Sequence, residues 1–254
     1  MRARVQVFNA RLDPLNEREA VDAIFRTIET GGRGWVCTIN VSILMAMRRS
    51  PALQSFVDRA MLTVADGQPL VWCAPLFGGR LPERVAGIDL MDSLCGRAAA
   101  DGCKVYLLGA SERVLTRALH GLRARHPGLR IEGSHGYFAA NEARCCAAKI
   151  RASGARLLFV GMGSPRQETF IAEHWEQLGV NVAMPVGGSF DVAGGAVVRA
   201  PRWAQRMGLE WLVRLLQEPR RLLPRYLVTN TLFCLLIVET VALRLRQWLR
   251  TRSP

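Results

Sequence analysis

The sequence predicts an α/β fold: a Rossmann-like, mostly parallel sheet with helices on both faces, followed by a basic helical appendage at the C-terminus. Short apolar runs alternate with segments of helical period, as in proteins that join parallel strands through helices. Several runs are rich in Val and Leu without strict alternation, which is typical of strands covered on both faces. A length of 254 residues, half of them hydrophobic, allows one large domain with an appendage.

The expected elements follow in chain order, strands where apolar runs are short and helices where apolar residues recur every three or four positions. The helical segment 40–59 is expected to break at Pro51, because proline cannot continue a helix. The expected strands are 34–39, 61–65, 103–109, 129–132, 156–160 and 181–186. The expected helices are 16–30, 40–59, 68–77, 88–100, 111–125, 140–152 and 165–178.

Charge divides the chain into two parts, which we place at residues 1–198 and 199–254. From Arg199 onward there are eleven arginines, no lysine and three glutamates, a net charge of +8 out of +13 for the whole chain. Apolar residues lie among these arginines in an amphipathic pattern that Pro219 and Pro224 should punctuate. We expect the first part to carry the chemistry and the basic second part to seek phosphate on nucleic acid, membrane or substrate.

Residues 226–238 form an uncharged stretch with arginines on both sides. These thirteen residues, or eighteen up to 243 if Glu239 is tolerated, fall short of the roughly 20 that a spanning helix needs. Basic flanks and Trp248 fit a helix that lies on, or dips into, an anionic membrane; the alternative is a helix packed on the domain or on another subunit. The N-terminus lacks a secretory apolar segment, so we expect peripheral attachment to the cytoplasmic side of the membrane.

The cysteine and histidine patterns favour neither disulfides nor a metal site. Seven cysteines, an odd number without a C-x-x-C pair, mostly lie in apolar runs, which is typical of a reducing compartment. The four histidines have no paired spacing, and no D-x-D stands in the chain. We therefore expect no metal and no cofactor.

Polar residues stand where two predicted strands end, and in parallel sheets ligands bind at the carboxyl ends of the strands. Asp66, with Gly67 beside it, suits a general base against a hydroxyl; alternatively it caps the following helix. Thr38 and Asn40 are short neutral hydrogen-bonders that suit sugar hydroxyls or a nucleobase, and helix capping explains them equally well.

Arg84 lies between flexible points of the chain and is suited to holding a diphosphate bidentately. The alternative is a surface pair with Glu83 or Asp89, which would contribute little stability. Gln167 and Glu168, at the start of a helix after a glycine turn, are placed to hydrogen-bond a base or ribose, or else face solvent.

A glycine-rich turn at 187–191 contains a buried-looking Phe190-Asp191 pair and precedes the cationic segment. Glycine lets backbone N–H groups approach a ligand closely, and arginine suits phosphate. Gly187 and Asp191 are therefore candidate ligand-binding residues at a site for something phosphorylated.

Taken together, these segments resemble the WecG/TagA/CpsF family of bacterial glycosyltransferases, glycosyltransferase family 26. The resemblance covers roughly residues 5–230 and rests on motifs that are numerous and in order. They are T-I-N at 38–40, A-D-G-Q-P-L-V-W at 65–72, E-R-V-A-G-I-D-L at 83–90, G-M-G-S-P-R-Q-E at 161–168 and G-G-S-F-D-V-A-G-G-A-V-V-R-A-P at 187–201, continued by G-L-E-W-L-V-R-L-L-Q-E-P-R-R at 208–221.

The resemblance implies transfer of a sugar from a UDP-sugar donor to a polyprenyl-diphosphate-linked acceptor, with inversion at the anomeric carbon and without an obligatory metal. It implies Asp66 as the catalytic base, and an appendage that reaches over the active site with arginines on the diphosphate. The best matches for those arginines are Arg214 and Arg221, and Arg225 is a weaker one. The active-site polar residues it implies are Thr38, Asn40, Arg84 and Gln167.

The residues after Asp66 and Gly67 depart from those of teichoic-acid and enterobacterial-antigen members, which are rich in isoleucine and glycine there. The segment Q-P-L-V-W at 68–72 looks more like the exopolysaccharide branch, of the xanthan glucosyltransferase kind. This indicates UDP-glucose rather than UDP-N-acetylmannosamine or its uronic acid as donor. Family members self-associate in some cases, so a homo-oligomer is a further expectation, although no interface signature supports it.

Two other function classes compete with the transferase. A nucleotide-binding oxidoreductase is disfavoured because Arg166 stands at the third glycine of the dinucleotide fingerprint and no acidic residue ends the following strand, where Val186 and Gly187 stand. A non-catalytic basic module binding nucleic acid would set its arginines among exposed aromatics. Trp203 and Trp211 are expected instead in a core or a bilayer, so no nucleic-acid partner is expected.

Overall fold

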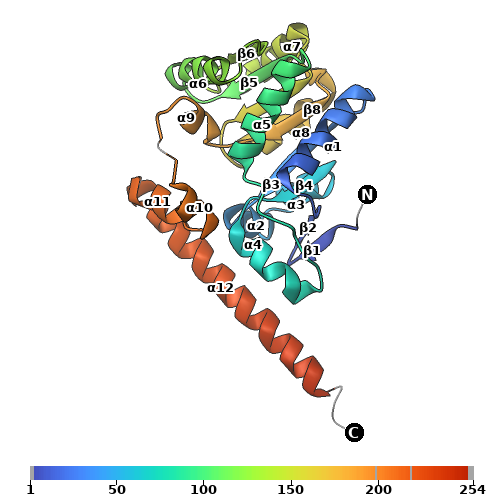
Figure 1. Ribbon diagram of the computed structural model, residues 1–254, viewed down its shortest axis with the longest axis vertical. Coiled ribbons are helices and arrows are strands. Elements are labelled where there is room, and N and C mark those ends of the chain that lie inside the picture. Colours follow the sequence, from blue (N-terminus) through green and yellow to red (C-terminus); the bar gives the residue numbers. More distant parts are fainter. Residues whose placement is uncertain (1–2, 198, 218, 251–254) are drawn as a thin grey trace.

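The computed structural model describes residues 3–197, 199–217 and 219–250 of the chain (Figure 1). Six parallel strands form one sheet in the order β4-β3-β8-β7-β5-β6. The expected α/β fold is therefore confirmed. The strands are β3 (Gly34–Ile39), β4 (Leu62–Ala65), β5 (Val105–Gly109), β6 (Ile131–Ser134), β7 (Leu157–Gly161) and β8 (Val182–Pro185).

Helices cover both faces of this sheet, and each face has its own hydrophobic core. Successive strand residues point to opposite faces, so Trp35 and Cys37 belong to one core while Val36 between them belongs to the other. One face carries α2 (Val41–Met47), α3 (Pro51–Asp58), α7 (Ala143–Ser153) and α8 (Arg166–Leu178). The other carries α1 (Glu17–Glu29), α5 (Gly87–Ala100), α6 (Glu112–Arg125) and α9 (Ser189–Ala193).

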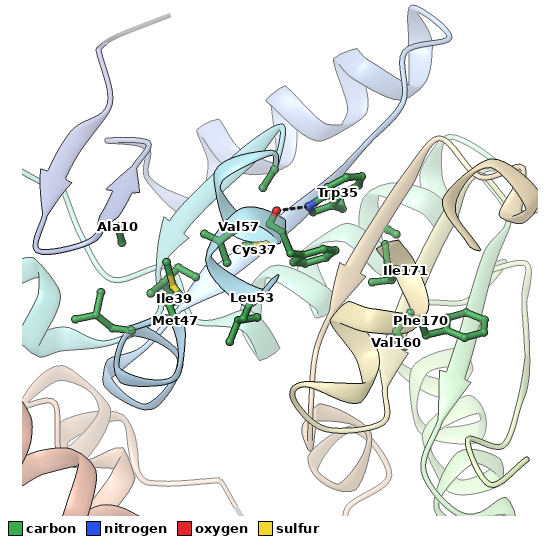
Figure 2. Packing of buried hydrophobic residues seen from close by; sticks show 14 of the residues in the cluster. Ala10, Trp35, Cys37, Ile39, Met47, Leu53, Val57, Val160, Phe170 and Ile171 are labelled. Carbon is green, nitrogen blue, oxygen red and sulfur yellow. Dashed lines mark hydrogen bonds between the residues drawn. The ribbon is translucent and has the colours of Figure 1, made fainter. Parts of the chain in front are cut away.

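Trp35 joins three elements of the first core, as Figure 2 shows in part. Its indole stacks on the Phe56 ring of α3 with centroids 5.0 Å apart, and its Nε1 donates to the Phe56 carbonyl oxygen at 2.9 Å. The edge of Trp175 in α8 lies 5.3 Å away. A large buried aromatic with its single donor satisfied fixes these helices against β3, so the end of β3 is held in a set position.

Several expectations about single elements are corrected. The segment 68–77 is split into α4 (Gln68–Cys73) and a 3-10 turn η1 (Ala74–Phe77), and a second 3-10 turn η2 (Ala140–Glu142) precedes α7. β6 lies two residues beyond the expected 129–132, and the glycine-rich turn contains the short helix α9. An antiparallel hairpin of β1 (Val5–Val7) and β2 (Ala10–Leu12) was not expected, since three-residue strands are too short to show alternation.

The appendage consists of three helices, α10 (Arg202–Arg206), α11 (Glu210–Gln217) and α12 (Pro219–Arg250). The expectation that Pro224 would punctuate this region is wrong, because Pro224 lies inside the 32-residue α12. A proline removes one backbone donor, and a long helix that packs on α2 tolerates that loss. Residue 198, our expected boundary, lies outside the described residues, and the division into two parts stays a prediction.

α12 packs lengthwise on the α/β body, and its C-terminal end projects beyond it (Figure 1). Phe233 is buried, with its ring 5.5 Å from that of Phe8, and the Arg244 guanidinium lies 5.5 Å from the Phe77 ring. By length and composition, the 19 residues Tyr226–Arg244 suffice to cross a membrane, and 6% of the window is buried. Our expectation that this stretch is too short is therefore corrected on that criterion.

Candidate active site

A cavity of about 1160 Å³ opens at the carboxyl edge of the sheet. Segments that directly follow β3, β4, β5, β7 and β8 line it, as the rule for parallel sheets predicts. Seven of the nine predicted site residues lie on its wall. They are Thr38, Asn40, Asp66, Arg84, Gln167, Gly187 and Asp191. The other two, Arg214 in α11 and Arg221 in α12, have side chains outside the described part of the structure.

Asp66 is held between the ends of β3 and β4 and the start of α5. Its backbone N–H donates to the Ile39 carbonyl at 2.9 Å, and its Oδ1 accepts from the N–H of Gly87, the first residue of α5, at 3.3 Å. The N-cap of α4 is Gly67, which has no side-chain cap, so the alternative that Asp66 caps this helix is wrong. The N-terminus of α5 favours a negative charge on Asp66, so the carboxylate is oriented and able to accept a proton.

Asn40 does two things at once. Its Oδ1 accepts from the Ile43 N–H at 3.1 Å and so caps α2, as the capping alternative predicted. That bond turns the amide nitrogen toward Asp66, where Nδ2 makes a long contact of 3.5 Å with Oδ2. Thr38 lies against Gly87 at the start of α5, because a Cβ added to Gly87 would stand 2.9 Å from the Thr38 Oγ1. Only glycine therefore lets α5 begin this close to β3.

Arg84 is engaged in an ion pair with the appendage. Its Nη1 donates to Oε2 of Glu210, the first residue of α11, at 2.8 Å, and the two side chains are only 13% and 11% exposed. The alternative that Arg84 forms a surface pair with Glu83 or Asp89 is wrong, because Glu83 accepts from the Glu17 N–H and Asp89 binds Arg199. Two ion pairs thus hold the appendage beside the cavity, and an anionic ligand would compete with Glu210 for Arg84.

Gln167 connects two walls of the cavity. Its Oε1 accepts from the Gly187 N–H at 3.0 Å, and its Nε2 donates to Glu168 Oε1 at 2.9 Å, so the solvent-facing alternative is wrong. Gly187 has φ +53, a conformation that favours glycine. Gln167 therefore positions the start of the 187–191 turn, under which Phe190 is fully buried.

Glu168 is expected, together with Gln167, to be a hydrogen-bonding or a solvent-facing residue, and the solvent-facing alternative is wrong for it too. It lines the cavity, it is buried, and its Oε2 has no hydrogen-bond partner among the described residues. Burial raises the pKa of this carboxyl above its ordinary value. The sequence signal available was its place beside Gln167 in the first turn of α8, which does not distinguish a buried carboxyl from a solvated one.

A second set of cavity residues comes from the appendage and was missed. Their spacing along α12 follows one face of a helix, a pattern that the sequence does show. Among the described residues, those of the appendage that line the cavity are Gly208, Glu210, Trp211, Gln217, Tyr226, Asn230, Phe233, Cys234 and Ile237.

Cysteine and acidic side chains offer no other obvious chemistry in the described ranges. No group of three or more His, Cys, Asp or Glu that would hold a metal ion occurs there, and all seven cysteines are free thiols. Burial raises the pKa of Cys37 on the cavity wall, so this thiol stays protonated. The arrangement that could carry out chemistry is therefore the carboxylate of Asp66 in a cavity whose wall also includes the 187–191 turn.

A family match covers the residues of this arrangement. The chain matches the model of the glycosyl transferase WecG/TagA/CpsF family over residues 5–248, which takes in the sheet, the cavity and nearly all of α12. This is longer than the expected span of 5–230 and includes most of the appendage. The match gives no support to the oxidoreductase or nucleic-acid alternatives. By the extent of this match, the chain belongs to the WecG/TagA/CpsF family of glycosyltransferases.

Proposed function

We propose that the chain is an inverting, metal-independent glycosyltransferase. It would move a hexose or N-acetylhexosamine from a UDP-sugar to a polyprenyl-diphosphate-linked saccharide in the synthesis of a bacterial surface polysaccharide or exopolysaccharide. The observation that carries the proposal is the placement of Asp66. It is a carboxylate fixed by Asn40 and the α5 N-terminus, on the wall of a cavity that also contains Arg84 and the 187–191 turn.

In the proposed reaction Asp66 accepts the proton of an acceptor sugar hydroxyl. The hydroxyl oxygen forms a bond to the anomeric carbon from the face opposite UDP, while the bond from that carbon to the UDP oxygen breaks. UDP leaves with the bonding electrons, and the configuration inverts. Asn40 supports the step by keeping its amide nitrogen beside the carboxylate rather than in solvent.

The negative charge on the departing diphosphate requires cationic side chains or hydrogen-bond donors, because the proposed reaction uses no metal ion to neutralise it. Arg84 lies on the cavity wall, and a diphosphate can replace Glu210 as its partner. The 187–191 turn would add backbone N–H donors other than those of Gly187 and Ser189, which donate to Gln167 and Val186. Arg214 and Arg221 stay predictions for the same role.

Asp66→Asn tests the base. The amide keeps the shape but accepts no proton, so turnover should fall by about 10²–10⁴-fold. The assay uses a lipid-linked acceptor and candidate UDP-sugars, with circular dichroism as the check on folding. Asp92→Asn, which removes an exposed carboxylate of α5 paired with Arg125, is the matched control and should retain turnover. Near-normal turnover of a folded Asp66→Asn protein would mean that another group is the base.

We also propose that α12 lies on the anionic, cytoplasmic surface of the membrane. Its inner side packs on the body as far as Arg244, while Leu227, Leu235 and Val238 are each at least 60% exposed on other sides. A helix that keeps protein along one side over this length is better placed along the surface than across the bilayer. Arginines of the appendage would supply attraction to anionic headgroups.

The double variant Leu235→Asp/Val238→Asp tests membrane contact. Burial of a Leu or Val side chain contributes about 1.5–3 kcal/mol, so co-sedimentation with anionic vesicles should weaken at least roughly tenfold. Cys145→Asp places the same charge on an exposed position of α7 and should leave vesicle binding unchanged. Equal vesicle binding by the double variant at low and high salt would contradict the proposal.

UDP-glucose as donor, and with it the exopolysaccharide branch, rests on residues 68–72 alone, and a homo-oligomer has no structural observation behind it. A thermal-shift screen of UDP-sugars, followed by product analysis, would identify the donor. A shift with UDP-N-acetylmannosamine but none with UDP-glucose would reverse the assignment of the branch.

A further inference from the structure

Part of the cavity is lined by both α2 and α12, two helices that contact each other, and we call this part the α2/α12 branch. The α12 residues on its wall are spaced by four, three, one and three positions, so they share one helix face. The opposite wall is the first turn of α2, which begins beside Asp66 because Asn40 caps it. From α12 the wall takes Tyr226, Asn230, Phe233, Cys234 and Ile237, and from α2 it takes Val41, Ser42 and Ile43.

The wall of this branch changes from polar to apolar along α12. Tyr226 and Asn230 lie at one end, and Phe233, Cys234 and Ile237 lie at the other. With a rise of 1.5 Å per residue, the step from Tyr226 to Ile237 covers about 16 Å. The branch therefore has the length and the polarity gradient of a site for an amphiphile.

The polar end lies next to the diphosphate donors of the proposed reaction. The Tyr226 ring meets that of Trp211 at a centroid distance of 5.8 Å, and Trp211 follows Glu210, which binds Arg84. A charged headgroup at this end would thus sit in the cavity that contains Asp66.

The apolar end is open to the outside. Cys234 lines the cavity and is nevertheless exposed, and its neighbour Leu235 is 60% exposed. A flexible apolar chain lying on Phe233 and Ile237 can leave the branch here. It would then continue along the surface of α12 that we propose to contact the membrane.

We infer that this branch binds the isoprenoid chain of the lipid-linked acceptor. The first isoprene units lie along Phe233, Cys234 and Ile237, and the diphosphate and its sugar extend past Tyr226 toward Asp66. This rests on the proposed function for the identity of the lipid. The polarity gradient, the continuity with Asp66 and the exit beside exposed apolar side chains select this occupant over a soluble saccharide.

Cys234→Trp fills the apolar end and tests the inference by kinetics. The KM for an acceptor with a long polyprenyl chain should rise at least roughly tenfold, a loss of about 1.4 kcal/mol in binding. The KM for an acceptor with a short alkyl chain, and for the donor, should stay unchanged. Cys145→Trp makes the same substitution at the other exposed cysteine, which lies in α7 and is absent from the cavity wall, so it is the matched control and should change neither KM. Equal effects on the two acceptors, or no effect on either, would overturn the inference.

Thiol alkylation tests the same branch without catalysis. Cys234 and Cys145 are exposed thiols and the other five are buried, so a maleimide should label these two first. Polyprenyl diphosphate in detergent should slow labelling of Cys234 at least tenfold and leave that of Cys145 unchanged. Equal protection by detergent or phospholipid alone would mean that the branch takes any acyl chain and would overturn the inference. Protection without turnover of either acceptor would instead refute the proposed function.

Discussion

The α/β body and the C-terminal appendage differ in how far they bury their large apolar side chains. In the body, the sheet has a closed core on each face, and the polar site residues line the cavity at its carboxyl edge. In the appendage, of the described side chains, Trp203, Leu216 and Val238 are large, apolar and more than 60% exposed, while Phe233 is buried. The body buries most of its apolar side chains in its own cores, whereas the appendage leaves large apolar side chains exposed, which fits the membrane contact that we propose.

The two parts meet along the packing of α12 on α2 and at specific pairs of side chains. Ion pairs join Arg84 to Glu210 and Arg199 to Asp89, and aromatic contacts join Phe233 to the N-terminal hairpin. Such contacts place the appendage without burying its outer surface. Core residues of the body therefore maintain the fold, whereas the residues of these contacts maintain the position of the appendage beside the cavity.

The largest expected difference is between two aromatic truncations. Phe190→Ala empties a fully buried site under the 187–191 turn and should lower the free energy of unfolding by about 3–5 kcal/mol. Trp203→Ala removes a side chain that is 62% exposed in α10 and should change it by less than about 0.5 kcal/mol. Urea unfolding of both variants measures the difference. Similar losses in the two would mean that the appendage is as much a part of the folded core as the sheet.

A smaller effect is expected at the ion pair between the parts. Glu210→Gln leaves the Arg84 guanidinium without its counter-charge and should lower the free energy of unfolding by about 1–3 kcal/mol. Because Arg84 is then free for a diphosphate, affinity for UDP measured by calorimetry should rise. Glu239→Gln changes an exposed glutamate of α12 and serves as the control. Unchanged UDP affinity in Glu210→Gln would show that the two anions do not compete for Arg84.

The smallest effect concerns pH and Glu168. Burial raises the pKa of this carboxyl above 4.5 in the folded state, so its stabilising contribution is complete below pH 4.5 and is lost as pH rises through the folded value. Glu168→Gln has no charge to bury, so its Tm relative to the unmodified protein should increase from pH 4 to pH 7. Glu173→Gln, at an exposed position of α8, should show no such trend. A pH-independent difference for Glu168→Gln would contradict the expected cost of ionisation.

Much of the body could be predicted from the sequence because its signals are local. Buried parallel strands leave unbroken apolar runs such as Leu157–Gly161, and caps such as Asn16 mark where helices begin. The hairpin could not be predicted, since its turn residues Phe8 and Asn9 include no glycine. Pro224 was misjudged because the packing that continues α12 past it involves α2, far away in the sequence.

The site divides in the same way. Asp66, Asn40 and Gly187 could be placed together, because the ends of parallel strands meet at one edge of the sheet. The partner of Arg84 could not be predicted, since Glu210 is 126 positions away and no local pattern links them. Burial of Glu168 likewise depends on how α8 packs against β3 and is invisible in its neighbours along the chain.

Phe8 stands in the hairpin turn with φ +52, a left-handed conformation that costs a non-glycine residue roughly 1–2 kcal/mol. The centroid of its ring lies 4.8 Å from that of Phe77 in η1 and 5.5 Å from that of Phe233 in α12, so Phe8 links these two elements. Any tilt of α12 must therefore move or release this ring. The hairpin formed by the first dozen residues therefore helps to hold α12 in place, although more than two hundred positions separate the two elements.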